Sequence, residues 1–302
     1  MSAADLKTPW SSLRAMALML CAATLGACTT TPPEPAGCPD ATQVSDMLNR
    51  YVAREPLPNP PQSLSVEAGL CGRARFEQAL GTRYGRIVGY KAGLTNAAVQ
   101  QRFNYPQPVR GTLFEAMLLP DGAQVPVRYG ARPIYEADLV VEVGSAAVHN
   151  ATTPAQVLAS LHAVRPFIEL PDLMLQDPTK IGGATINLIN VGARLGVLGA
   201  PIPVASHPGL ADALASMTVR VVDGTGAQLD AGPGSAILGH PLNAVIWLAA
   251  DLRKSGITLK PGDLLSLGSF SRPLTPQAGQ TVRVAYDGLP GNPSVSVHFT
   301  ER

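Results

Sequence analysis

The sequence has little charge of either sign and few aromatic side chains. Charged residues make up 15% of its 302 positions, aromatic residues 5%, and the formal net charge is +1. The basic residues are scattered and form no run. A nucleic-acid partner would call for a positive surface or for aromatic platforms on which bases stack, so the composition argues against one.

A membrane-spanning helix is not predicted near the N-terminus either. The apolar run over residues 15–27 is shorter than the roughly 20 residues that a helix needs to cross a bilayer. It follows Lys7 and Arg14, an order typical of a secretory signal peptide. We therefore leave residues 1–27 out of the fold as a signal peptide.

The run ends in Leu25-Gly26-Ala27-Cys28, which resembles the lipobox of bacterial lipoproteins. The resemblance implies cleavage before Cys28 and acylation of that cysteine, with residues 28–39 as a flexible tether. The residue after the cysteine is Thr29 and not Asp, which under the sorting rule known for enteric bacteria favours the outer membrane, facing the periplasm. An ordinary signal peptide followed by a chance cysteine is the alternative.

Cysteine is scarce, with four in the chain. Cys21 would leave with the signal peptide and Cys28 would carry lipid. Cys38 and Cys71 remain, and an oxidising periplasm would allow a disulfide between them. The sequence does not fix the distance between these two residues.

The remaining composition is that of a folded protein, with 46% hydrophobic residues and many turns marked by 29 Gly and 28 Pro. Residues 40–54 show the apolar spacing of an amphipathic helix, residues 56–61 hold four prolines, and residues 70–80 read as a second helix. We predict a small helical region over residues 40–84 in front of a main domain over residues 85–302.

Residues 133–143 alternate as a strand does, so Glu136 and Asp138 share one face. Beside a core, two carboxylates raise each other's pKa unless a cation lies between them. A solvated sheet edge is the alternative. A second short run, residues 166–170, carries Glu169, and a neighbouring strand there would complete a three-carboxylate site suited to Mg²⁺ or Mn²⁺.

Helices and strands alternate irregularly through the main domain, which predicts an α+β fold. Thr153-Pro154 should open a helix that buries Leu161 and Val164, and residues 240–255 form the clearest helix. A strand is expected over residues 217–222, and strands that close the sheet are expected over residues 263–270, 281–286 and 294–299.

Lys91 is a cation inside the apolar strand over residues 86–94, and Thr95 is the expected N-cap of the helix that follows. A lysine whose charged end reaches the surface is the default interpretation. A lysine in a pocket beside a metal could instead move protons.

Several stretches resemble the 2-keto-4-pentenoate hydratases of the fumarylacetoacetate hydrolase superfamily, together with the related 4-oxalocrotonate decarboxylases. The resemblance covers roughly residues 65–302 and implies a large mixed β-sheet roll with a small N-terminal helical cap. The matching stretches are Gly89–Thr95, Gly111–Met117, Glu136 with Asp138, Glu169, residues 180–190, residues 238–245, residues 259–263 and Gly268-Ser269.

The resemblance implies a hydratase that adds water to 2-hydroxypenta-2,4-dienoate, the enol of 2-oxopent-4-enoate. Glu136, Asp138 and Glu169 would bind Mg²⁺ or Mn²⁺, and the small 2-oxo acid would chelate the ion. Lys91 and Glu115 would be catalytic. Substrate contacts would come from Asn190, Gly268 and Ser269. The family forms dimers and larger assemblies, which leaves a homo-oligomer open.

The sequence departs from the family pattern at three places. Asp138 replaces the usual Glu, the acidic pair before Met117 is Glu115-Ala116, and the Asp-Asn-x-Ser-Ser-Gly stretch becomes Ile189–Arg194. A decarboxylase and an exported lipoprotein that binds a small oxo acid without turnover therefore stay open. A C–C hydrolase would need a His–Glu pair before the metal strand, whereas the first histidine is His149.

Overall fold

The structure is a computed structural model that describes residues 33–301. The chain divides into two units, residues 1–34 and 35–302, and the second holds the helices and strands described here. The signal peptide and Cys28 lie outside the described residues.

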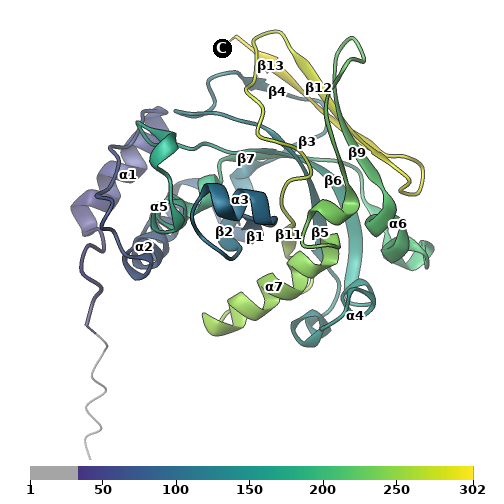
Figure 1. The fold of residues 1–302 in the computed structure, drawn as a ribbon, viewed down its shortest axis with the longest axis horizontal. Helices are drawn as coiled ribbons and strands as arrows, with labels where there is room; N and C mark the ends of the chain where they lie inside the picture. Colours follow the sequence, from purple (N-terminus) through teal and green to yellow (C-terminus); the bar gives the residue numbers. More distant parts are fainter. Residues whose placement is uncertain (1–32, 302) are drawn as a thin grey trace, which may run out of the picture. The chain divides into compact units, whose positions relative to one another are not determined.

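An eight-stranded mixed sheet carries the domain (Figure 1). Its strands run in the order β2-β1-β11-β5-β6-β7-β3, with β8 paired to β6. β1 is parallel to β11 and β3 to β7, whereas the other pairs are antiparallel. The bounds are β1 Ile87–Gly93, β2 Val109–Phe114, β3 Leu118–Pro120, β5 Glu136–Val143, β6 Leu161–Leu170, β7 Leu195–Leu198, β8 Ile202–Pro203 and β11 Leu264–Ser266.

A second sheet of five strands has the order β10-β9-β12-β13-β4. The strand predicted over residues 217–222 is confirmed as β9, whereas the prediction that β12 and β13 close the first sheet is wrong. Their alternating valines bury one face against the first sheet, so both sheets share one core. The bounds are β4 Ala123–Pro126, β9 Thr218–Asp223, β10 Gln228–Pro233, β12 Thr281–Asp287 and β13 Ser294–Thr300.

Tyr286 of β12 joins the two sheets through its buried hydroxyl group. The hydroxyl lies within hydrogen-bond reach of the carbonyl oxygens of Asp138 and Phe167, and it accepts from the Phe167 amide at 3.0 Å. These bonds fix β5 and β6, the strands that carry the predicted carboxylates, to the second sheet.

Helix α7, Pro241–Lys254, packs on this shared core close to where it was predicted. Within the described residues, Gly234–Lys254 is the one stretch long and apolar enough to span a membrane, a test that buried core helices also pass. Helix α4, Pro154–Leu158, is shorter than predicted, and Leu161 and Val164 lie in β6 instead. The other helix on this side is α6, Leu210–Ser216.

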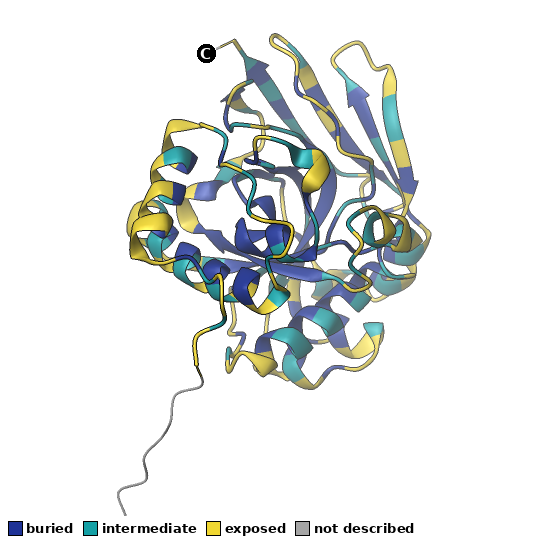
Figure 2. Cartoon of the chain, turned by 60° about the vertical axis from the view of Figure 1, so that its left-hand side comes forward, coloured by how far each residue is buried: buried dark blue, intermediate teal, exposed yellow. Residues whose placement is uncertain are grey.

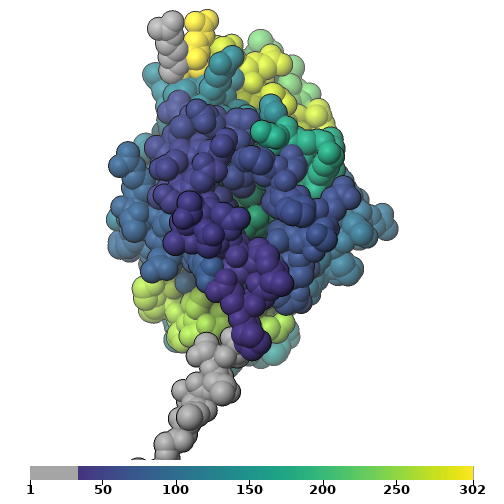
Figure 3. Space-filling view, turned by 90° about the vertical axis from the view of Figure 1, so that its left-hand side faces the viewer, coloured from purple at the N-terminus to yellow at the C-terminus, as the bar shows by residue number. Residues whose placement is uncertain are grey.

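The N-terminal helices form a second core with α5, Gly183–Leu188, and with β2. Helix α1, Ala41–Ala53, begins at a capping box made by Asp40 and Gln43, and α2, Val66–Tyr84, begins at Ser65. Both predicted helices are confirmed, the second with longer bounds. Figure 2 shows that their inward sides are buried, and on the side seen in Figure 3 the residues of α1 form much of the surface.

The Cys38–Cys71 disulfide joins the segment before α1 to α2, with 5.7 Å between the Cα atoms, as the sequence analysis anticipated.

Helix α3, Ala97–Arg102, follows β1. Its N-cap is Asn96, whose side chain accepts from the Val99 amide, and not the expected Thr95, which is buried. Asn96 caps the helix because its short side-chain carbonyl reaches the amide of Val99, the third residue of the helix.

Candidate active site

Glu136, Asp138 and Glu169 come from two paired strands. In the antiparallel register of β5 and β6, Glu136 lies opposite Glu169 and Asp138 lies opposite Phe167. Directly paired residues share a face, and so do residues two apart on one strand. The strand that carries Glu169 thus lies where the sequence predicted it, and all three carboxylates belong to one face of the large sheet.

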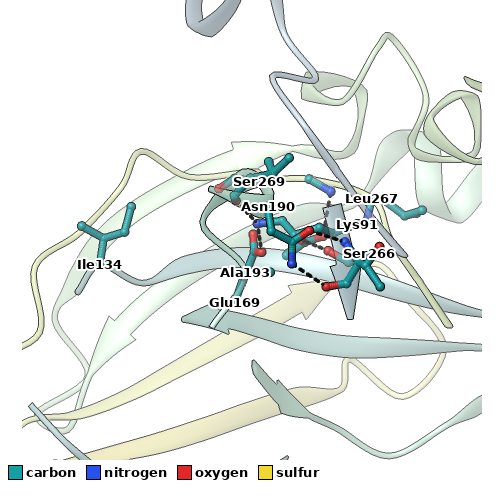
Figure 4. Close-up of polar contacts among 12 residues, drawn as sticks. Lys91, Ile134, Glu169, Asn190, Ala193, Ser266, Leu267 and Ser269 are labelled. Atoms are coloured by element: carbon teal, nitrogen blue, oxygen red, sulfur yellow. Dashed lines mark hydrogen bonds and ion pairs between the residues drawn. The ribbon is translucent and has the colours of Figure 1, made fainter. Parts of the chain in front are cut away.

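Lys91 joins this face from β1. Lys91 lies opposite Ser266 of β11, and Ser266 lies opposite Val140 of β5. Val140 follows Asp138 by two residues and therefore shares its face of the sheet. The Lys91 side chain is only 3% exposed, forms an ion pair with Glu169 and donates to the Val191 carbonyl at 2.9 Å (Figure 4). The default interpretation of a surface lysine is therefore wrong, since the ammonium group has a buried carboxylate as partner.

Asp138 is fully buried and held by the end of β11. Its carboxylate accepts from the Ser266 hydroxyl, from the Leu267 amide at 3.1 Å and from the Gly268 amide at 2.9 Å. Gly268 has a φ of +104°, and a Cβ there would lie 2.2 Å from the hydroxyl oxygen of Thr95. Glycine at position 268 is thus needed to bring this amide to Asp138.

Burial and mutual repulsion disturb the ionisation of these acids. Burial, and next the charge of Glu169, raise the pKa of Glu136 to about 8. The same two causes raise the pKa of Asp138 well above its usual value, opposed by the hydrogen bond from Ser266. Lys91 lowers both pKa values but supplies one positive charge among three acids.

The chemistry of these three carboxylates suits a divalent cation. When ionised, three carboxylates and one lysine would carry a net negative charge in a buried place, and hard oxygen donors suit Mg²⁺ or Mn²⁺. As placed, however, no three His, Cys, Asp or Glu side chains within residues 33–301 lie close enough to share an ion. Glu169 is paired with the Lys91 ammonium group instead, and the ligand set stays a prediction.

The predicted substrate contacts are engaged within the chain. Asn190 is fully buried, and its amide accepts from the Thr112 amide at 2.7 Å and donates to the Thr112 carbonyl at 3.0 Å. The Gly268 amide donates to Asp138, and the Ser269 hydroxyl donates to the Ser271 carbonyl at 2.7 Å. Ser269 stays half-buried beside the site, so of these three its side chain is the most accessible to substrate.

Glu115 does not join the site, contrary to the prediction. Phe114, the residue before it, pairs with Ile87 at one end of β1, whereas Lys91 pairs with Gly111 farther along. The Glu115 side chain is 57% exposed and forms an ion pair with Arg86. It lines a cavity of about 350 Å³ together with Glu142 and Arg165.

Sequence reasoning missed three groups that shape the site, namely Ser266, the Val191 carbonyl and Arg194. Ser266 lay inside the predicted strand 263–270, where a polar side chain between two leucines was the available signal. The Val191 carbonyl has no signal in the sequence, because its placement depends on a turn with positive φ. Arg194 stands out in the sequence only as a departure from the family pattern.

Comparisons with known proteins agree with this fold. A family model described as "Fumarylacetoacetate (FAA) hydrolase C-terminal" matches residues 83–292. A 2-keto-4-pentenoate hydratase of Burkholderia vietnamiensis is 31% identical over 72% of this chain and 79% of its own. A 2-hydroxyhexa-2,4-dienoate hydratase of Comamonas testosteroni is 30% identical over 75% of this chain and 82% of its own.

Among solved structures, 4-oxalocrotonate decarboxylase from Pseudomonas putida G7, complexed with magnesium and adipate, superposes with a TM-score of 0.74. It is 22% identical and covers 85% of this chain and 95% of its own, which supports the fold alone. The family match spans more than half of the sequence and includes β1, β5, β6 and β11, the strands that build the site. The chain therefore belongs to the fumarylacetoacetate hydrolase family.

Proposed function

We propose that the protein is a metal-dependent hydratase that adds water to a 2-hydroxy-2,4-dienoate such as the enol of 2-oxopent-4-enoate. The observation that carries the proposal is the buried Lys91–Glu169 ion pair, which stands on one sheet face with Glu136 and Asp138. Relatives with about 30% identity over most of this chain are named hydratases of such acids.

Glu136, Asp138 and Glu169 would hold Mg²⁺ or Mn²⁺. Support comes from the chemistry of the three carboxylates and from the decarboxylase structures of the same fold, which were solved with magnesium or calcium. A bound ion would act as a Lewis acid toward the 2-oxygen of the substrate. The site would bind the 2-oxo and carboxylate oxygens of the acid together.

Lys91 would move the proton. Its ammonium group is held between the Glu169 carboxylate and the Val191 carbonyl, on the face where the substrate would lie. In the reaction the dienol tautomerises and the oxygen of water adds at carbon 4, which gives 4-hydroxy-2-oxopentanoate. Burial of Lys91 fixes where its protons point, so proton transfer needs little reorganisation.

The test is turnover of fresh 2-hydroxypenta-2,4-dienoate by the chain from residue 29, with Mg²⁺, with Mn²⁺ and with chelator. We expect loss of the dienoate absorbance that requires metal and falls at least about 100-fold in Glu136→Ala. Glu142→Ala is the matched control, because Glu142 lies on the same strand but pairs with Arg165. Metal-independent turnover, or full activity of Glu136→Ala, would contradict the proposal.

A second candidate is a protein that binds a small oxo acid without turnover. The observation in its favour is that the Asp138 carboxylate and the Asn190 amide are already bonded within the chain. Calorimetric binding of metal and of 2-oxopentanoate, with the dienoate absorbance unchanged, would favour this candidate over the hydratase. A decarboxylase would instead release CO₂ from a 2-oxo acid with a second carboxylate.

We also propose that Cys28 carries lipid and anchors the protein in the outer membrane, facing the periplasm. The Cys38–Cys71 disulfide supports an oxidising compartment. Acylation would appear as a mass increase on the peptide that begins at residue 28, absent in Cys28→Ala. A homo-oligomer stays a prediction that sedimentation of the mature chain would test.

A further inference from the structure

Three successive residues beside Lys91 adopt a left-handed backbone. Asn190, Val191 and Gly192 have φ values of 52°, 54° and 67°. A β-branched residue such as Val191 rarely adopts this conformation, so contacts from outside the turn must hold it. The turn matters for the site because the Val191 carbonyl accepts from the Lys91 ammonium group.

Arg194 supplies the most extensive of these contacts. Its side chain is buried, and its guanidinium group lies 4.0 Å from the centre of the Tyr51 ring. Nε donates to the Tyr129 carbonyl at 2.9 Å, and Nη1 donates to the Tyr51 carbonyl. One side chain thus joins the end of the turn to helix α1 and to the segment before β5.

Two further bonds fasten the same turn. The Tyr51 hydroxyl donates to the Ala193 carbonyl at 2.9 Å, and the Asp172 amide donates to the Gly192 carbonyl at 2.9 Å. Asp172 follows Glu169 by three residues, and its carboxylate accepts from the Ala131 and Arg132 amides. The turn is therefore bound on one side to α1 and on the other to the segment that directly follows β6, the strand that carries Glu169.

We propose that Arg194 is a positioning residue, which fastens the turn over residues 190–192 to helix α1 so that the Val191 carbonyl holds Lys91 against Glu169. The kinetic part of this inference rests on the proposed hydratase function, whereas its structural part does not.

The test compares Arg194→Met with Arg194→Lys, using the mature chain. Hydrogen exchange is followed in the peptide that covers the turn, and modification of Lys91 by an amine reagent is followed by peptide mapping at one fixed pH. Loss of hydrogen bonds made by a charged group should speed both about tenfold in Arg194→Met. Arg194→Lys should recover part of the effect, because it keeps the charge and one bond to a carbonyl.

Kinetics supply the readout that loosened packing alone would not move. In Arg194→Met we expect kcat to fall about tenfold while KM stays within about twofold, because Lys91 would act on substrate that is already bound. Arg220→Met is the control, since Arg220 pairs with Asp287 in the other sheet. If wild type turns nothing over, the proposed function fails, and exchange and labelling still decide this inference.

A folded Arg194→Met protein with unchanged exchange at the turn and unchanged labelling of Lys91 would overturn the proposal. Should Arg194→Met fail to fold, Arg194→Lys decides, because lysine keeps the charge but bonds only one of the two carbonyl oxygens that Arg194 reaches. A severalfold rise in both readouts in Arg194→Lys supports the fastening. Wild-type values in Arg194→Lys overturn it.

Discussion

At the scale of single residues, Glu136 makes the stability of the metal-free protein depend on pH. Its pKa rises from 4.5 to about 8 on folding, so the folded state binds more protons than the unfolded state between these values. Stability should therefore fall as the pH rises from 5 to 8. At pH 8 the free energy of unfolding of Glu136→Gln should exceed that of wild type by on the order of 2 kcal/mol, since this side chain is half-buried.

The measurement is urea unfolding in chelator at pH 5 and pH 8, read as the difference between the variant and wild type. Glu142→Gln is the control, because Glu142 pairs with Arg165 outside the site. A bound divalent ion should remove the advantage of Glu136→Gln, since it favours the ionised carboxylate. An equal difference at both pH values would refute the role of Glu136.

The sequence identifies unusual single residues more readily than it identifies the residues that contact them in the fold. Lys91 stood out as a cation in an apolar strand, but its partner Glu169 lies far along the chain and no local pattern gives that register. The Glu136–Asp138 face followed from strand periodicity alone. Glu115 was misplaced because a motif gives neighbours in sequence and not the direction in which the strand leaves the site.

At the scale of elements, helix α7 depends on a neutral histidine. His240 Nδ1 accepts from the Leu242 amide at 3.0 Å, and Nε2 faces the Ala211 carbonyl at 3.1 Å. Burial lowers the pKa of His240, and the Ala211 carbonyl and the charge of Asp212 oppose that shift. The cap is fully present above pH 6.5 and is lost as the pH falls below that value, because protonation removes the acceptor.

Substitution of His240 separates the cap from its titration. His240→Ala should destabilise the protein by about 1 kcal/mol at pH 8, as loss of an N-cap does. His240→Asn keeps an acceptor that does not titrate and should match wild type at pH 8 while losing less stability at pH 5.5. Thermal unfolding followed by circular dichroism gives the comparison, and parallel losses in wild type and His240→Asn would exclude the histidine.

The edge strand β2 relies on side chains for its outer hydrogen bonds. Asn190 pairs with both backbone groups of Thr112, and Arg73 donates to the Arg110 carbonyl at 2.7 Å. Because buried backbone groups left unpaired are costly, Asn190→Ala should destabilise the protein by about 2–4 kcal/mol. Unfolding in urea measures this, with Asn96→Ala, a helix cap worth about 1 kcal/mol, as the control.

Asn190 also separates a structural role from a substrate contact. If the side chain bound substrate instead, Asn190→Ala would raise KM and leave the free energy of unfolding near that of wild type. The sequence could not decide this, because the bond to Thr112 depends on the left-handed backbone of residue 190. Nor could periodicity assign β9, β12 and β13 to a second sheet, since alternation gives a buried face but not its partner.

At the scale of the whole molecule, the Cys38–Cys71 disulfide closes a loop over a sequence separation of 33. A cross-link of that length restricts the unfolded chain and should contribute about 3–4 kcal/mol. We expect reduction, or the double substitution of Cys38→Ser and Cys71→Ser, to lower the free energy of unfolding by that amount. Equal urea midpoints for the oxidised and reduced protein would contradict this, and the double variant should not respond to reductant.

The hydroxyl of Tyr286 has a consequence for the order in which the protein can be completed. It bonds the backbone at Asp138 and Phe167 across more than one hundred positions of sequence. During synthesis, the strands that carry Glu136 and Glu169 leave the ribosome long before residue 286 does. The strands that carry Glu136 and Glu169 can therefore be fixed in place only after the β12–β13 hairpin has been synthesised. A nascent chain stalled before residue 286 would not yet have a finished site.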